Sequence, residues 1–189
     1  VAYGSIPVIY RRLFTPVPID IPDFYVPREE LESSCIQSIT RWMRGRPTSI
    51  LVYGDRGTGK RTLLRHLRPM RFADDSADLD EEDITRLQFG SRISSERELC
   101  RKLQPLVDGN GTGSLSRIGS RLHSRTGREI VVVEDPHSIF ARTEEGLERM
   151  RTFLTFMSDT ADQVLWIVLM RKPTATFLET SLDLLDYFT

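Results

Sequence analysis

The stretch Ser49–Leu67, SILVYGDRGTGKRTLLRHL, determines how the rest of the chain is interpreted. An apolar run, Ile50–Tyr53, leads into the glycine-rich segment Gly54–Lys60, and leucines at helical spacing follow. A strand, a glycine-rich turn that ends in lysine, and a helix are the order that a phosphate-binding loop requires. Glycines let consecutive backbone N–H groups converge on a phosphate, and the helix presents its positive N-terminal end to the same anion. The stretch therefore predicts a site for a phosphate-containing ligand.

The predicted ligand contacts lie in the loop and the first turn of its helix: Gly54, Asp55, Arg56, Gly57, Thr58, Gly59, Lys60, Arg61 and Thr62. In this motif a Ser or Thr normally follows the lysine, and its hydroxyl holds Mg²⁺. Here Arg61 stands at that place, and Thr62 comes one residue later. A guanidinium so close would repel the metal by up to several kcal/mol in a partly buried site. The sequence leaves two alternatives open: Arg61 points outward while Thr62 binds the metal, or Arg61 contacts the phosphate itself.

A second apolar strand is predicted at Glu129–Val133, and the acids Glu134 and Asp135 follow it directly. Downstream of a phosphate-binding loop, such acids predict the other half of a nucleotide site. One carboxylate holds Mg²⁺ through water, and the other orients or deprotonates the attacking water. We therefore expect Glu134 and Asp135 to be catalytic, and Glu134 to serve the metal together with Thr62. The alternative is a pair of exposed turn acids ahead of Pro136.

A third apolar segment, Val164–Met170, predicts a strand that is buried on both faces and ends at Arg171 and Lys172. The carboxyl ends of parallel strands meet at the edge of the sheet where ligands bind. Either cation is therefore placed to sense a γ-phosphate, and we assign Arg171 to the catalytic set. The alternative is that these charges only terminate the strand.

Buried strands alternate with amphipathic helices along the chain. Besides the helix of the loop, helices are predicted at 28–43, 95–106, 115–125, 143–159 and from Thr174 or Thr176 onward, with a short strand at 86–90. This order predicts an α/β fold, a three-layer sandwich with a mainly parallel sheet between two layers of helices. Residues 1–27 hold five of the ten prolines and predict an extended arm or linker, whereas 28–189 form the nucleotide-binding domain.

Composition restricts the class of protein. The formal net charge of −1 gives no overall attraction to nucleic acid or membranes. Cys35 and Cys100 lie in apolar helical patterns and are interpreted as packed thiols in a reducing compartment. No apolar run is long enough to span a bilayer, and no signal peptide is present, so we expect a cytoplasmic location. The chain starts without Met and stops inside a predicted helix, so we expect a fragment whose full-length protein could still be membrane-anchored.

Arginines at i, i+4 and i+8 give the predicted helix 115–125 a basic stripe, formed by Arg117, Arg121 and Arg125. Such a stripe could contact a nucleic-acid backbone or an acidic partner. An ordinary solvated helix face is the alternative, and it is the commoner one.

Together these pieces resemble P-loop ATPases of the AAA+/STAND group, including origin-recognition-like and transposition-regulator ATPases. The matching segments are Gly54–Lys60, Val131–Asp135 and Val164–Met170. In addition, Phe24–Leu31 is similar to the box that precedes the first helix in this group and lies near the adenine. The resemblance covers roughly residues 24–189.

The resemblance implies an AAA+-like core without its helical lid, with ATP or ADP and Mg²⁺ as ligands. In that group Lys60 would contact the phosphates, Glu134 and Asp135 would serve Mg²⁺ and water, and Arg171 would occupy the sensor position. The sensor is usually Asn, Thr or Ser. The lid of the group, with its arginine finger and second sensor, would follow residue 189.

Three functions remain open on the sequence alone. The first is a slow ATPase that acts as a switch or an assembly motor, with a protein partner or in an oligomer. The second is a nucleotide-binding scaffold without catalysis, which Arg61, the reversed order Glu134-Asp135 and Arg171 favour. The third is a P-loop kinase for a small molecule. It would need an acceptor pocket and a mobile lid, for which we see no clear motif.

Overall fold

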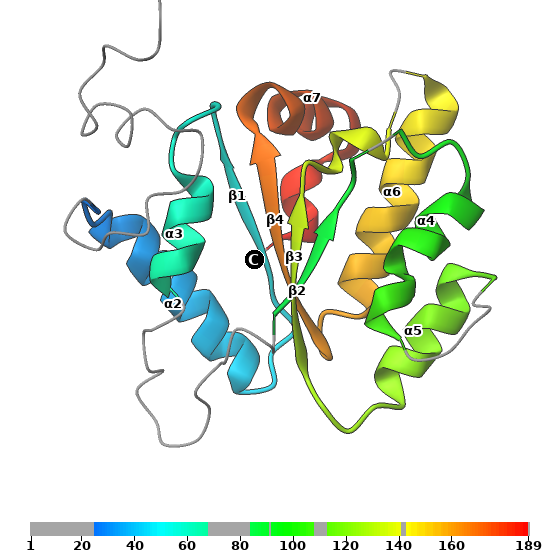
Figure 1. Ribbon diagram of the computed structural model, residues 1–189, viewed down its shortest axis with the longest axis horizontal. Helices are drawn as coiled ribbons and strands as arrows, with labels where there is room; N and C mark the ends of the chain where they lie inside the picture. The colour runs from blue at the N-terminus through cyan, green and yellow to red at the C-terminus, as the bar shows by residue number, and fades with distance from the viewer. Residues whose placement is uncertain (1–24, 68–83, 91, 108–112, 141–142, 189) are drawn as a thin grey trace, which may run out of the picture.

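The computed structural model describes residues 25–67, 84–90, 92–107, 113–140 and 143–188. Within these ranges the strands are β1 (Ser49–Gly54), β2 (Ile84–Gln88), β3 (Glu129–Glu134) and β4 (Val164–Arg171). They form one sheet in the order β1-β4-β3-β2, and each neighbouring pair is parallel (Figure 1). The predicted parallel sheet is therefore confirmed.

Helices cover both faces of this sheet. They are α2 (Glu29–Met43), α3 (Lys60–Leu67), α4 (Glu96–Leu103), α5 (Leu115–His123), α6 (Glu144–Asp159) and α7 (Lys172–Leu182), with the short 3₁₀ turns η4 (Gln104–Leu106), η5 (Pro136–Ser138) and η6 (Leu184–Tyr187). Figure 1 shows α2 and α3 on one side of the sheet and α4, α5 and α6 on the other. The three-layer sandwich is thus present as predicted.

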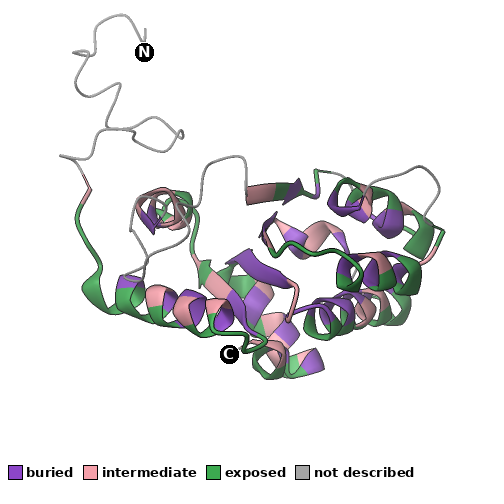
Figure 2. Cartoon of the chain, turned by 90° about the horizontal axis from the view of Figure 1, so that it is seen from below, coloured by how far each residue is buried: buried purple, intermediate pink, exposed green. Residues whose placement is uncertain are grey.

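Two separate hydrophobic cores lie on the two faces of the sheet, because successive side chains of a strand point to opposite faces. In β4, Trp166 and Val168 pack into the larger core, formed with α4, α5, α6 and α7. Leu165 and Ile167 pack into the smaller core, formed with α2 and α3. Figure 2 shows the buried residues on the inner sides of the helices. Burial on both faces explains why Val164–Met170 is apolar at every position.

The last helix differs from the prediction at both ends. α7 begins at Lys172, directly after β4, and has a proline in its first turn. Proline is favoured there because its fixed φ suits a helix start, and because an N–H group in the first turn would have no hydrogen-bond partner within the helix. Thr174 and Thr176 are therefore inside the helix and do not cap it. The helix ends at Leu182 because Asp183 adopts a left-handed conformation with φ 51°.

The predicted basic stripe is not continuous. α5 ends at His123, so Arg125 lies beyond the helix that carries Arg117 and Arg121. Its Nη1 donates a hydrogen bond to the Leu106 carbonyl at 2.8 Å. The same nitrogen lies 3.3 Å from a carboxylate oxygen of Glu129. Contact with nucleic acid through these three arginines stays a prediction.

Other sequence-based expectations concern single elements. β2 is Ile84–Gln88, two residues earlier than predicted. Cys35 and Cys100 are buried and free, and burial raises the pKa of both thiols. None of the described helices is both long and apolar enough to cross a membrane. Of the predicted arm 1–27, only 25–27 are among the described residues.

Candidate functional site

The loop Gly54–Lys60 connects the carboxyl end of β1 to the first turn of α3. Gly57 and Gly59 have φ values of 84° and 78°, in the left-handed region that favours glycine. At Gly54 the constraint is space, because a Cβ there would lie 2.9 Å from Oγ1 of Thr58. The sequence therefore folds into a tight turn that carries Lys60 to the helix N-terminus.

Lys60 is held against its own loop. Its Nζ donates hydrogen bonds to the carbonyl oxygens of Gly54 and Asp55, each at 2.8 Å. Burial is the main cause that lowers the pKa of Lys60, and the neighbouring charges of Arg171 and Arg61 lower this pKa further. The carboxylates of Asp135 and Asp55 act in the opposite direction.

The electrostatic neighbours of Lys60 come from several elements that are distant in sequence. Arg61 belongs to α3, Asp135 follows β3 and Arg171 ends β4. Because each of these charges acts on Lys60, the predicted residues lie around one point at the carboxyl edge of the sheet. This convergence is what a parallel sheet predicts for residues at its strand ends.

Strand register explains the convergence. Gly54 of β1 is level with Arg171 of β4, and Glu134 of β3 is level with Leu169 of β4. β4 therefore lies between the strand that leads into the loop and the strand that ends in the acids.

Asp135 is the residue at which the chain turns from β3 into η5. It has φ 52° and ψ 52°, a left-handed conformation that is uncommon outside glycine and better tolerated by Asp and Asn than by bulky residues. Its Oδ1 lies 3.9 Å from Nε of Arg171 and 3.8 Å from Nδ1 of His137. Two nitrogen-bearing side chains thus face this carboxylate. His137 was not among the predicted site residues, and it joins the site because the turn after β3 places it two residues beyond Asp135.

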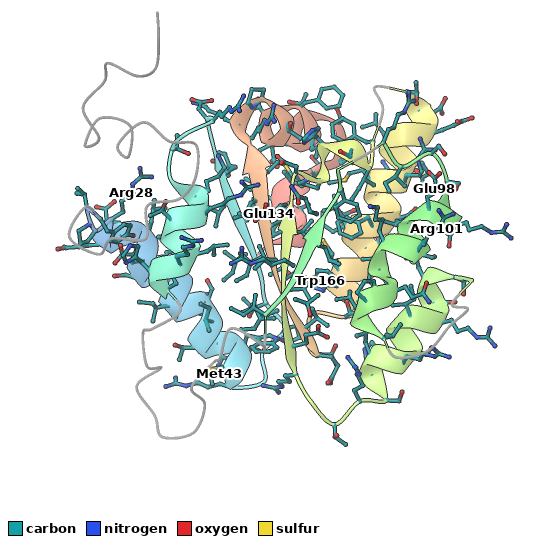
Figure 3. All side chains as sticks on the ribbon, in the orientation of Figure 1. Arg28, Met43, Glu98, Arg101, Glu134 and Trp166 are labelled. Atoms are coloured by element: carbon teal, nitrogen blue, oxygen red, sulfur yellow. The ribbon has the colours of Figure 1, made fainter. Side chains whose placement is uncertain are left out.

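Glu134 is bound by Arg61. The Nη2 of Arg61 lies 2.5 Å from Oε2 of Glu134, and the glutamate side chain is only 12% exposed. Figure 3 shows Glu134 at the carboxyl end of β3, in the middle of the sheet. The sequence did not predict this partner, because the guanidinium reaches across from α3 to the end of β3. Contact of Arg61 with a phosphate stays a prediction. The ion pair joins the first turn of α3 to the end of β3.

A small polar pocket of about 240 Å³ borders this ion pair, between α3 and the strands β2 and β3. Its lining residues are Arg61, Leu64, Arg65, Arg86, Gln88, Val132 and Glu134. Arg86 and Gln88 were not among the predicted site residues. The signal that would have found them is the topology, because Gln88 of β2 is level with Glu134 of β3.

As the side chains lie, the residues do not fit the predicted Mg²⁺ site. The carboxylate of Glu134 faces a guanidinium. Thr62 follows Arg61 on α3, and consecutive helix positions do not face the same way. Among the described residues, no group of three or more His, Cys, Asp or Glu side chains is arranged to hold a metal ion. The metal roles of Thr62 and Glu134 stay predictions.

The segment that resembles the adenine box packs against the loop helix. The ring of Tyr25 stacks on that of His66 in α3, with the ring centroids 3.5 Å apart. The Tyr25 hydroxyl donates a hydrogen bond to Glu32, which also accepts one from the backbone N–H of Arg28. Burial and the contact with Glu32 raise the pKa of Tyr25 to about 12. The start of α2 is thereby fixed to the helix that follows the loop.

No protein-family model and no curated protein matches the sequence. Among solved structures, the chain is similar to the ORC1 protein of Aeropyrum pernix in a complex with DNA. The two are 17% identical with a TM-score of 0.52, over 84% of this chain and 43% of the ORC1 chain. The chain is also similar to a Walker-type ATPase of Pyrococcus abyssi, at 19% identity and a TM-score of 0.49, over 93% of this chain and 53% of that one.

The chain thus spans less than half the length of the ORC1 chain that it matches. At this level of identity the likeness concerns the fold. The parallel sheet with its order β1-β4-β3-β2, the helices on both faces and the glycine-rich loop after β1 agree with it. The chain therefore shares the fold of the part of the ORC1 chain that it matches.

Proposed function

We propose that the chain is an ATP-binding module of the P-loop type. The observation that carries the proposal is the placement of Lys60. It stands at the N-terminus of α3, after a loop in which two of the three glycines have positive φ, and its ammonium group is turned onto that loop. Backbone N–H groups in such a turn, a lysine and a helix N-terminus together suit a polyphosphate.

The charges around the loop support a polyphosphate rather than a neutral ligand. Lys60, Arg61 and Arg171 contribute three positive charges at the strand ends, and the carboxylates of Asp55, Glu134 and Asp135 lie among them. Arg61 is paired with Glu134, whereas Lys60 and Arg171 lie on the loop side of the site. The oxygens of a triphosphate would accept charge-assisted hydrogen bonds from these two cations.

We further propose that the nucleotide state acts as a switch, or as part of an assembly motor, toward a protein partner or a second copy of the chain. The support is the position of the site, at which α3, the turn after β3 and the end of β4 meet. A ligand that contacts all three would couple their positions. In this proposal Asp135 and Glu134 serve the attacking water, and Arg171 senses the γ-phosphate.

The ion pair between Arg61 and Glu134 favours a second candidate function, a scaffold that binds nucleotide without turning it over. A carboxylate held by a guanidinium at 2.5 Å is poorly placed to act on water or a metal. The two candidates share the binding step and differ in hydrolysis.

Binding is tested by titration with ATP and ADP, each with and without Mg²⁺. The chain has three lysines, Lys60, Lys102 and Lys172, which supplies a matched control. Lys60→Ala should weaken binding at least about tenfold, because it removes a charge-assisted contact to phosphate. Lys102→Ala, at an exposed residue of α4, should bind like the unaltered chain. Absence of binding by the unaltered chain under every condition would refute the proposal.

Turnover separates the two candidates. Phosphate release from ATP is measured for the unaltered chain, Lys60→Ala and Arg61→Thr. Release above background that Lys60→Ala abolishes supports the ATPase. Background release by a chain that binds ATP supports the scaffold, and the gain of release in Arg61→Thr would identify Arg61 as the cause.

A further inference from the structure

We infer that Arg61 supplies, from within the chain, the positive charge that a divalent metal supplies in the usual loop, so that the site takes ATP as a metal-free polyphosphate. This inference rests on the proposed ATP binding and adds to it the chemical form of the ligand. It makes Arg61 the residue that determines whether Mg²⁺ contributes to affinity.

The position of Arg61 is the first step. It is the residue directly after Lys60, where a metal-binding hydroxyl would otherwise stand. Its guanidinium contacts Oε2 of Glu134, the more buried of the two acids at the end of β3. A cation therefore lies between the loop helix and this carboxylate, which is the place that a metal would need.

The second step concerns the ligands that remain. Mg²⁺ takes six oxygen ligands in near-octahedral geometry, and carboxylates are its usual protein ligands. Glu134 is engaged by Arg61, and the Oδ1 of Asp135 faces Arg171 and His137 at 3.9 and 3.8 Å. A metal ion would have to displace a guanidinium from a nearly buried carboxylate, which would leave Arg61 unpaired beside the new charge.

The third step is the charge of the surroundings. The pocket beside the ion pair is lined by two further guanidinium groups, Arg65 and Arg86, and by one carboxylate, that of Glu134. Lys60 lies on the loop side, close enough for the charge of Arg61 to lower its pKa. The guanidinium groups on the side of the ion pair would repel an added divalent cation and attract a phosphate, whereas the carboxylates of Asp135 and Asp55 lie on the side of Lys60.

The last step is the chemistry of the guanidinium itself. Arginine carries five N–H donors in a planar fork and keeps its charge at all accessible pH values. The bond to Glu134 is made by Nη2, and the side chain is 48% exposed. The other N–H donors of the Arg61 guanidinium can therefore reach a phosphate oxygen while the ion pair with Glu134 fixes the orientation of the group.

The test compares the dissociation constant for ATP in a chelator with that in millimolar Mg²⁺, by isothermal titration. For the unaltered chain the two constants should agree within about threefold, a difference below ~1 kcal/mol. For Arg61→Thr, ATP should bind at least about tenfold more tightly with Mg²⁺ than in chelator, because a hydroxyl replaces the cation. Arg101→Thr removes the same charge from the exposed side of α4 (Figure 3) and should behave like the unaltered chain.

The outcomes separate this inference from the proposed function. If the unaltered chain binds ATP in Mg²⁺ but at least about tenfold more weakly in chelator, ATP binding stands and the inference is wrong. If it binds in neither condition, the proposed function itself fails. The unaltered chain alone decides whether ATP binds and whether Mg²⁺ contributes to its affinity, so these two questions are answered even if circular dichroism shows that Arg61→Thr does not fold. The role of Arg61 is refuted if the folded variant binds ATP equally well in both conditions.

Discussion

Gly54, the first residue of the phosphate-binding loop, is the register partner of Arg171, the last residue of β4. The side chain of Arg171 also lies 3.9 Å from Asp135 at the end of the neighbouring strand. Arg171 thus lies between the loop and Asp135, and the parallel register places its backbone beside Gly54. This relationship makes Arg171 testable apart from Lys60.

Arg171→Met should weaken binding of ATP about fivefold, the equivalent of ~1 kcal/mol, because the lost charge is half exposed and partly screened. Binding of ADP should change by less than about twofold if the residue contacts the γ-phosphate. Both constants are measured by titration. Arg101→Met, which removes an exposed charge from α4, is the control. Equal losses for ATP and ADP would contradict a role in sensing the γ-phosphate.

The affinity for ATP should depend on alkaline pH through Lys60. Burial and two neighbouring arginines lower its pKa from the ordinary value of 10.5. Phosphate binding needs the charged amine, so affinity should be full below this lowered pKa and should fall as pH rises through it. Bound phosphate favours the charged form, so binding in that window should take up a proton.

The proton uptake is measured by calorimetry in buffers of different ionisation enthalpy. Lys102→Ala should keep the uptake, since Lys102 lies on α4. An affinity that stays constant until pH reaches the ordinary lysine value would show that the pKa of Lys60 is not lowered.

Thr160→Val should destabilise the fold by about 1–3 kcal/mol, because it leaves a buried N–H without an acceptor. The indole Nε1 of Trp166 donates to Oγ1 of Thr160 at 3.1 Å, and both residues are almost fully buried. Thr160→Ser keeps the hydroxyl and should lose about 1 kcal/mol or less, for the missing methyl group. Urea unfolding gives both values, and equal losses would contradict the importance of the hydrogen bond.

Thr143→Ala should cost about 1 kcal/mol of unfolding free energy, because Oγ1 of Thr143 accepts the backbone N–H of Gly146 at the start of α6. Ser114 holds the same position before α5 but makes no side-chain capping bond. Ser114→Ala should therefore cost less than about 0.5 kcal/mol. The comparison uses the same unfolding assay, and the reverse order of the two losses would refute it.

One of the five tyrosines should ionise late in an ultraviolet pH titration. Burial, and then the hydrogen bond and charge of Glu32, raise the pKa of Tyr25 from 10.0 to about 12. The folded chain favours the neutral phenol, so stability from this group should fall as pH rises from about 10 to about 12. Tyr25→Phe should remove the late step, and Glu32→Gln should move it only part of the way back, since burial remains. A titration that is unchanged in Tyr25→Phe would assign the late step elsewhere.

Much of the fold could be predicted because its signals are local. The glycines Gly57 and Gly59 are needed for positive φ, and the unbroken apolar run Val164–Met170 marks a strand with two covered faces. Connecting such strands by helices makes the sheet parallel, which brings the residues at the carboxyl ends of its strands to one edge. The order β1-β4-β3-β2 was not among the predictions. The sequence therefore identifies the loop, the acids and Arg171 as neighbours.

The ion pair between Arg61 and Glu134 could not be predicted in the same way. The two residues are 73 positions apart, and their contact depends on how a long, flexible side chain is directed across two elements. The end of α7 is a similar case, because Asp183 adopts a left-handed conformation that nothing in the local pattern requires. Arg125 was wrongly predicted to lie in the helix, because the spacing of the arginines indicates a common face but does not show where the helix ends.

The separation of the two cores has a consequence for hydrogen exchange. The loop helix α3 belongs to the smaller core with α2, whereas α4, α5, α6 and α7 share the larger one. Regions with fewer buried contacts open more readily than the whole domain unfolds. The amides of α2 and α3 should therefore exchange before those of β4, which is paired on both sides. A ligand held by Lys60 would slow amide exchange in α2 and α3. The layer of helices that binds the phosphates is therefore the layer in which ligand binding should raise local stability most.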